Sequence, residues 1–203
     1  MPDDRLLADY YFLALELPAG MELETRLDAD LNGDRLTDIA FVARNEDRRV
    51  LGVLLGYLAE VDMGHTPNGK AELAIGALGP ASLTAPKGVL VVEDLTGGTT
   101  ATAATYRYRY DGKQERMRLI GLDAQRYSRT NSHDSLKLSW NLLDGTHIVE
   151  RGALNRSGQG DEAYFYSAPE KTMHKTQPVW MENTPNPDDL IDAEVVPSGE
   201  DRD

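Results

Sequence analysis

Residues 105–123 read TYRYRYDGKQERMRLIGLD, and they give the clearest evidence for the fold class. Tyrosine and arginine alternate from residue 106 to residue 110, which is the two-residue period of a half-buried strand. Asp111-Gly112 is a dipeptide typical of tight hairpin turns, and a second run follows from Glu115 to Asp123. The stretch therefore predicts an antiparallel hairpin with its three tyrosines on one face.

Similar short runs, rich in β-branched and aromatic residues, recur between clusters of Gly, Asp, Asn and Pro. Roughly ten strands at spacings of about 8–12 residues predict an all-β sandwich, barrel or propeller. A loop is expected over Asp62–Lys70. The predicted strands are Asp9–Leu17, Asp38–Arg44, Arg49–Tyr57, Ala71–Ala77, Gly88–Asp94, Thr105–Tyr110, Glu115–Asp123, Leu136–Leu143, Thr146–Arg151 and Ala163–Ser167.

One internal repeat favours a small β-propeller among these architectures. Asp30-Leu31-Asn32-Gly33 recurs in the chain as Asp94-Leu95-Thr96-Gly97, and propellers are built from repeated units. The fold expected is an all-β, propeller-like domain over residues 1–181. Residues 182–203 form an acidic, proline-containing tail that is expected to be extended or disordered.

Charge excludes one class of partner. The chain of 203 residues has 34 acidic and 21 basic residues, a net charge of −13. Nucleic-acid binding needs a basic stripe that this sequence lacks, whereas cations and basic proteins are favoured. There is no cysteine, so disulfides, thiolate zinc sites and thiol nucleophiles are excluded.

The segment from Asp28 to Asp38 predicts a calcium-binding loop. Calcium requires six to eight oxygen ligands that converge on one point, and oxygen-bearing side chains occupy alternate positions here, with Gly33 at the bend. The carbonyl of Leu36 would supply a backbone ligand, and Asp28 a supplementary one. The predicted ligands of Ca²⁺ are Asp28, Asp30, Asn32, Asp34, Leu36 and Asp38.

Two alternatives compete with this register. An EF-hand loop that starts at Asp28 would need a bidentate glutamate twelve positions along, where the chain has Ile39. A turn rich in Asp and Asn could also form without any metal, because both residues are common turn formers.

The loop Asp30–Asp38, followed by the apolar run Ile39–Val42, resembles the FG-GAP or VCBS-type repeat, with Arg35 where that repeat usually has glycine. The resemblance implies a β-propeller, an extracellular or periplasmic compartment and a calcium ion with a structural role.

No catalytic constellation emerges from the sequence, and the protein is not expected to be an enzyme. The four histidines, His65, His133, His147 and His174, lack metal-ligand spacing. Motifs of serine hydrolases, zinc proteases and phosphate-binding loops are missing. A spatial pair of carboxylates, as in glycosidases, stays open because sequence does not show it.

Four strings between Val92 and Val149 carry a second resemblance: EDLTGG, YRYRYDG, RMRLIGLD and LSWNLLDG. Together with the calcium loop they are similar to bacterial periplasmic lipoproteins that confer immunity against a type IV-secreted peptidoglycan hydrolase. The resemblance implies a calcium-bound propeller that inhibits a lysozyme-like enzyme by inserting a loop into its active site. Lysozyme inhibitors of this kind use a Ser-Gly-x-x-Tyr loop, which this chain lacks.

The residues that could play the analogous part lie in Glu93–Tyr110, where small residues lead into an aromatic strand. We expect partner binding by Gly97, Gly98, Thr102 and Tyr106. The alternative is a plain strand whose threonines face solvent and whose tyrosines line the core. Ser157–Asp161 is a second exposed candidate, or an ordinary turn.

The resemblance implies a periplasmic monomer whose partner is a secreted peptidoglycan hydrolase. Met1–Arg5 is acidic and does not resemble a signal peptide, so the signal and the lipid anchor of the native protein are expected to be missing from this chain. The second functional class is a calcium-stabilised FG-GAP or VCBS-type propeller that binds a cell-surface glycan or protein.

Overall fold

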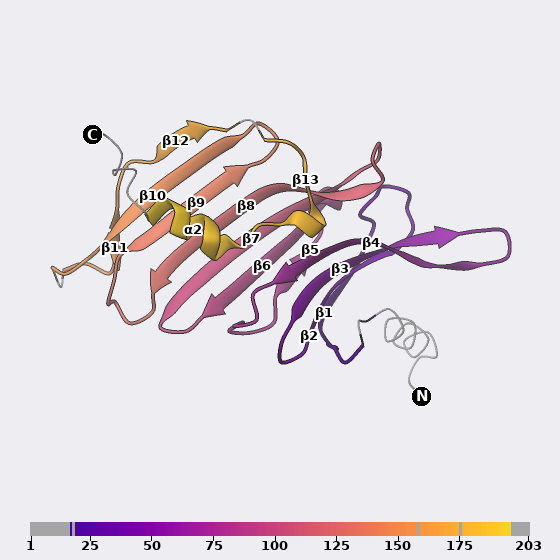
Figure 1. Cartoon of the computed structure of the whole chain (residues 1–203), viewed down its shortest axis with the longest axis horizontal. Coiled ribbons are helices and arrows are strands. Elements are labelled where there is room, and N and C mark those ends of the chain that lie inside the picture. Colours follow the sequence, from indigo (N-terminus) through magenta and orange to yellow (C-terminus); the bar gives the residue numbers. More distant parts are fainter. Residues whose placement is uncertain (1–16, 18, 158, 175, 196–203) are drawn as a thin grey trace, which may run out of the picture.

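A computed structural model describes residues 17, 19–157, 159–174 and 176–195. These residues form two antiparallel sheets (Figure 1). The first sheet has the order β1-β2-β3-β4, and its strands are β1 (Glu22–Ala29), β2 (Asp38–Arg44), β3 (Arg49–Leu58) and β4 (Met63–Leu73). All four are joined by three sequential hairpins, β1–β2, β2–β3 and β3–β4, so this sheet is a meander.

The second sheet has nine strands and the order β11-β10-β9-β8-β7-β6-β5, with β12 beside β10 and β13 beside β8. Two short 3-10 helices, η1 (Pro86–Gly88) and η2 (Met181–Asn183), and helix α2 (Pro187–Val195) complete the described elements. The strands are β5 (Ser82–Thr84), β6 (Leu90–Gly97), β7 (Thr100–Asp111), β8 (Arg116–Ser128), β9 (Ser135–Asn141), β10 (Thr146–Leu154), β11 (Tyr164–Tyr166), β12 (Glu170–Met173) and β13 (Val179–Trp180).

The all-β prediction is confirmed, but a propeller is not shown. Within the described residues neither sheet closes, and the strands do not fall into repeated blades. The repeat that favoured a propeller also has a different explanation. Its first copy follows β1 as a loop, whereas Asp94–Gly97 lies within β6. The two tetrapeptides therefore share letters and not structure.

Most predicted strands are present, and the misses have local causes. Strand Asp9–Leu17 falls outside the described residues apart from Leu17. The loop expected over Asp62–Lys70 is instead the first part of β4, because its polar residues pair with the exposed end of β3. Strand β1 was not predicted; its charged residues alternate too irregularly to show a period of two.

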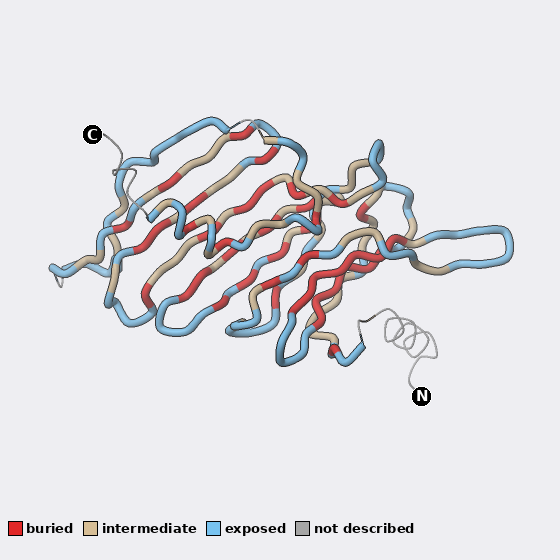
Figure 2. The backbone as a smooth tube through the Cα atoms, in the orientation of Figure 1, coloured by how far each residue is buried: buried red, intermediate tan, exposed pale blue. Residues whose placement is uncertain are grey.

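The main core lies between the two sheets (Figure 2). It joins apolar side chains of β2 and β3 to those of β6, β7 and β8. The alternation of tyrosines on β7 places Tyr106 and Tyr108 on the same face of the strand, where both are buried in the main core. A bulge at Arg107/Tyr108 lets β8 keep both Leu119 and Leu122 on the core side.

A buried ion cluster links the sheets beside this core. The guanidinium of Arg49 donates to Glu24 at 2.6 and 2.8 Å and to Asp94 at 2.8 Å. All three side chains are almost fully buried. Burial alone would raise the pKa of Glu24, but the hydrogen bonds from Arg49 and the N–H of Ala81 lower it.

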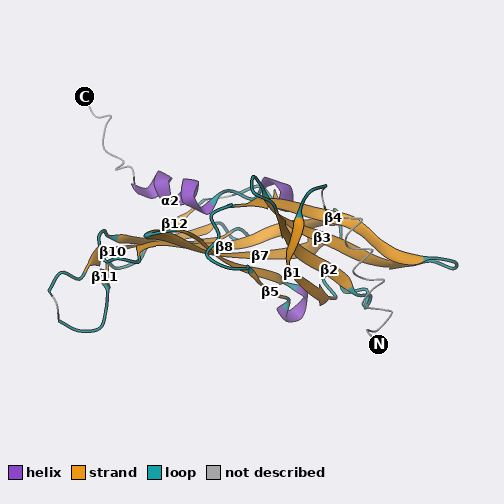
Figure 3. Ribbon diagram, turned by 90° about the horizontal axis from the view of Figure 1, so that it is seen from below, coloured by secondary structure: helices purple, strands orange, loops and turns teal. Residues whose placement is uncertain are grey.

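The C-terminal segment is not an extended tail over its described residues. Helix α2 lies on one face of the long sheet (Figure 3), where Ile191 packs into a cluster with Leu136, Leu138 and Val149. The missed signal is Asn-Pro-Asp-Asp: the side chain of Asn186 accepts from the N–H of Asp188 at 2.9 Å, and proline and acids suit a first helical turn.

Candidate functional site

The loop between β1 and β2 is held by its own short polar side chains. Asp30 accepts from the N–H groups of Gly33 and Arg35 at 2.7 and 3.0 Å. Asn32 accepts from the N–H of Asp34 at 3.0 Å. Gly33 and Arg35 have positive φ angles of 86° and 71°, so the chain bends twice and the polar side chains can fold back onto the backbone.

Asp34 continues the same pattern on the far side of the bend. Its carboxylate accepts from the N–H of Leu36 at 2.7 Å and from the side-chain amide of Asn32 at 2.9 Å. Asp28 lies outside the loop, on β1, and is paired with Arg26 through a 2.6 Å contact. Asp28 therefore already has a cationic partner in the protein.

Asp38 joins the loop to the neighbouring hairpin. Its buried carboxylate accepts from the N–H of Leu31 at 2.7 Å and from the N–H of Gly56 at 2.8 Å. The pKa of Asp38 is raised, first because burial disfavours the charged form, and also because Asp34 is negative. Asp38 thus fixes two backbone segments at the expense of a desolvated charge.

The side-chain oxygens of residues 30–38 are of the kind that binds calcium, but in this structure they accept hydrogen bonds from the backbone, as in a turn. Carboxylate and amide oxygens are the ligands that calcium prefers. In the described part of the chain, however, no three acidic or histidine side chains are grouped as a metal site requires. The oxygens instead accept backbone hydrogen bonds. Calcium binding stays a prediction, and the same hydrogen bonds are those that a turn rich in Asp and Asn makes.

Strands β3 and β4 extend well past their own sheet. Pairing of β2 with β3 ends at Ile39↔Leu54, whereas β3 and β4 stay paired from Leu55↔Thr66 to Leu58↔Met63. We call residues 55–66 the projecting hairpin, which points away from the body in Figure 1.

Apolar side chains occupy the tip of the projecting hairpin. Val61 is 97% exposed, Met63 73%, Leu58 65% and Tyr57 39%. The turn itself is well formed, because the N–H of Ala59 donates to the carbonyl of Asp62 at 2.7 Å. The phenol of Tyr57 donates to Asp62 at 2.9 Å, and this bond raises the pKa of Tyr57.

The base of the projecting hairpin packs against the loop. A ring nitrogen of His65 lies 2.9 Å from the carbonyl oxygen of Thr37. A Cβ at Gly56 would come within 2.6 Å of the same oxygen, so glycine is required for this close approach. Together with the Asp38 bond, these contacts make the loop a brace for the hairpin.

The projecting hairpin was not predicted from the sequence, although a signal for it was present. The apolar run from Val50 to Leu58 is longer than the seven-residue β2 can pair. A strand that outlasts its partner must either end or project. The apolar residues Val61 and Met63 on the far side of the turn favour projection.

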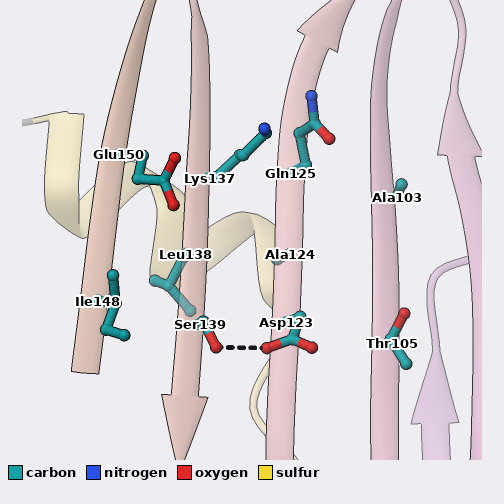
Figure 4. A pocket seen from close by; sticks show the side chains of 10 residues that line it. All are labelled: Ala103, Thr105, Asp123, Ala124, Gln125, Lys137, Leu138, Ser139, Ile148 and Glu150. Atoms are coloured by element: carbon teal, nitrogen blue, oxygen red, sulfur yellow. Dashed lines mark hydrogen bonds between the residues drawn. The ribbon is translucent and has the colours of Figure 1, made fainter. Parts of the chain in front are cut away.

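A second candidate surface is the polar face of the long sheet, opposite α2. It forms an open hollow of about 340 Å³ (Figure 4). Asp123 accepts from Ser139 and Arg107, both at 2.6 Å, and the ammonium of Lys137 lies 3.6 Å from the ring centre of Tyr166. Asp123 and Lys137 are therefore engaged by neighbouring side chains.

This face also bears on the question of paired carboxylates. Asp123 on β8 and Glu150 on β10 are separated by β9, and the register sets them two residues apart. Strand spacing puts their backbones roughly 12 Å apart. Glycosidases hold two carboxyl groups about 5–9.5 Å apart, and the carboxylate of Asp123 is here engaged by Arg107 and Ser139.

The predicted partner-binding residues are divided by the fold. Tyr106 is 2% exposed and Thr102 5%; the first stacks on Tyr108 in the core, and the hydroxyl of the second donates to Asp188 on α2 at 2.6 Å. Burial raises the pKa of Tyr106. Tyr106 and Tyr108 thus line the core, as the plain-strand alternative expected. The same alternative expected the threonines to face solvent, but Thr102 is buried. Gly97 and Gly98, in contrast, are exposed at the β6–β7 turn.

Two further observations bear on identity. None of the helices in the described ranges is long and apolar enough to cross a membrane. A comparison with protein-family models, curated proteins and solved structures found no match.

Proposed function

We propose that this protein is a periplasmic immunity-type inhibitor that binds a lysozyme-like peptidoglycan hydrolase and blocks its active site. The strings between residues 92 and 149, and the loop 30–38, support this through their resemblance to such inhibitors. The proposal needs an element that enters a cleft, and it does not depend on the propeller that the same resemblance implies. Residues 30–38 would hold Ca²⁺ as a structural ion.

The observation that carries the proposal is the acidic charge of the chain. Its net charge is −13; on α2, Asp189 is exposed, whereas Asp192 is paired with Arg126. Hydrolases that bind the acidic bacterial wall carry positive charge, and opposite charges speed association of two proteins. An acidic, surface-charged inhibitor suits such a target.

A turbidity assay of cell-wall lysis tests this function. The protein is titrated into a fixed amount of a cationic lysozyme-like hydrolase at low and at physiological ionic strength. We expect the lysis rate to fall to zero near one equivalent, with weaker inhibition at higher salt because exposed charges are screened. Unchanged lysis at a tenfold molar excess in low salt, together with no binding by calorimetry, would reject the proposal.

A second candidate function is binding of a cell-surface glycan or protein on the polar sheet face. The open hollow of about 340 Å³ favours it. Exposed aromatic platforms, which glycan binding uses, are less evident, since the ring of Trp180 is covered by Arg116 at 4.7 Å. Calorimetry with soluble wall fragments, on the wild type and on Lys137→Ala, distinguishes this function. Binding that the substitution removes would support it.

A further inference from the structure

We propose that the tip of the projecting hairpin, residues 57–63, is the surface that enters the partner, and that it fits an apolar recess bordered by basic side chains. This inference rests on the proposed function and names the element that performs it. It moves the binding surface away from Tyr106 and Thr102, which are buried, to the opposite end of the molecule from α2 (Figure 2).

Apolar side chains at the tip of the projecting hairpin are exposed without a structural reason. Leu58, Val61 and Met63 are each at least 65% exposed, although burial of apolar side chains away from water would lower the free energy of the protein. Scattered apolar residues on a surface need no explanation, but a contiguous group is typical of an interaction site. Here the group is concentrated on one turn of a hairpin that extends past its sheet.

The tip of the projecting hairpin is ordered in advance of binding. The Ala59–Asp62 turn bond and the bond from Tyr57 to Asp62 hold the turn, and the ring of Tyr57 covers Gly64, where a Cβ would lie 3.0 Å from the phenol oxygen. At the base, Asp38 fixes Gly56. A preformed element loses little conformational entropy on binding, which favours affinity.

The charge of the tip indicates the kind of partner that it fits. Residues 57–63 contain Glu60 and Asp62 and no lysine or arginine. Such a tip would be repelled by an anionic lipid surface, and also by a second copy of this chain with its net charge of −13. A cationic protein with an apolar recess satisfies both the carboxylates and the apolar side chains. The cationic hydrolase of the proposed function is a partner of this charge.

Two substitutions at the tip test this without disturbing the fold. Val61→Arg replaces a side chain that is 97% exposed, and Ile75→Arg, 62% exposed in the chain after β4, is the matched control. Glu60→Lys changes charge at the tip, and Glu46→Lys makes the same change at the exposed β2–β3 turn. Circular dichroism and thermal unfolding verify that all four variants fold.

Binding to the hydrolase and inhibition of lysis are then measured for each variant. We expect Val61→Arg to weaken binding by about tenfold or more, as for a central apolar contact, and Glu60→Lys to slow association several-fold more than Glu46→Lys. Ile75→Arg should bind like the wild type. Equal binding by Val61→Arg and the wild type would overturn the inference while leaving the proposed function intact.

Three other outcomes would also overturn it. A wild-type protein that does not bind the hydrolase removes the function on which the inference depends. Binding of the wild type, but not of Val61→Arg, to vesicles of anionic phospholipid would identify the tip as a membrane element. A dimer in sedimentation experiments that Val61→Arg dissociates would identify it as a contact between copies.

Discussion

The carboxylate of Asp38 and the backbone N–H of Gly56 are joined by a 2.8 Å hydrogen bond, across eighteen residues of sequence. The same carboxylate accepts from Leu31 at 2.7 Å. One buried side chain therefore holds both the acidic loop and the base of the projecting hairpin. Changes in the loop should be felt at the hairpin, although the two are built from different parts of the chain.

Asp38→Asn should loosen both segments. The amide can accept only through its oxygen, so one of the two N–H donors faces an NH₂ group, and we expect a loss of about 1–3 kcal/mol of unfolding free energy. Urea unfolding measures the loss, and hydrogen exchange at Gly56 shows where it acts. Asp34→Asn, on the exposed side of the loop, is the control and should cost less. Equal exchange rates at Gly56 in both variants would contradict the bracing role.

Calcium should bind to residues 30–38 and raise the melting temperature. A ligand at a hundred times its Kd stabilises the folded state by about 2.7 kcal/mol. Calorimetry and thermal unfolding with CaCl₂ measure this, with MgCl₂ for comparison. The double variant Asp30→Asn/Asp34→Asn should abolish binding, whereas Asp28→Asn should retain most of it because Asp28 is paired with Arg26. No heat and no shift with calcium would leave the metal-free turn as the explanation.

Acid should destabilise the link between the sheets through Glu24. Its folded-state pKa is lowered below the ordinary value of 4.5, so its contribution is fully present above pH 4.5 and is lost as pH falls through the folded-state pKa. The difference in unfolding free energy between the wild type and Glu24→Gln should shrink across that interval. If this difference in unfolding free energy stays constant down to the acid transition, the ionised carboxylate of Glu24 does not stabilise the folded state.

Asp38 should show the opposite sign. Its pKa is raised above the ordinary value of 3.8, so the folded state binds the proton more tightly than the unfolded chain. The stability contributed by Asp38 is therefore greatest below pH 3.8 and falls as pH rises through the folded-state pKa. Comparison of the wild type with Asp38→Asn over pH 3–7 measures this, and bound calcium should suppress the fall because a cation favours the carboxylate.

Removing the central charge of the ion cluster should be costly. Arg49→Met leaves Glu24 and Asp94 buried without their cation, and breaking a buried pair in this way costs about 3–5 kcal/mol. Arg48→Met is the control, because Arg48 pairs with Glu72 on the exposed surface. Chemical unfolding distinguishes the two. Similar losses for both variants would mean that Arg49 does not link the sheets.

The phenol of Tyr106 should be dispensable for inhibition. Tyr106→Phe keeps the ring that packs in the core and removes only the hydroxyl, so the turbidity assay should give wild-type inhibition. If the hydroxyl enters the hydrolase, as the resemblance to lysozyme inhibitors suggested, the variant should lose inhibition while its melting temperature stays the same. Tyr106→Ala would not separate these cases, since it leaves a core cavity.

Local sequence determined many of the strands of this protein, though not β1 or the first part of β4. The alternation of Tyr106, Tyr108 and Tyr110 predicted a strand with these tyrosines on one face, because side chains of a strand alternate between faces wherever the strand lies. The run Asp38–Arg44 likewise predicted β2 at its observed bounds. The loop 30–38 was also predictable from local sequence, because its Asp and Asn side chains accept hydrogen bonds from backbone N–H groups only a few residues away.

Only the tertiary structure decided which of those features is exposed. Tyr106 and Thr102 looked available in sequence, but Tyr106 is covered by the first sheet and Thr102 lies against α2. Both of these covering parts are encoded far away along the chain. The projecting hairpin arises because β2 stops at the register of Leu54 while β3 and β4 continue. Where one strand ends relative to another is set by long-range pairing and packing, which no local pattern specifies.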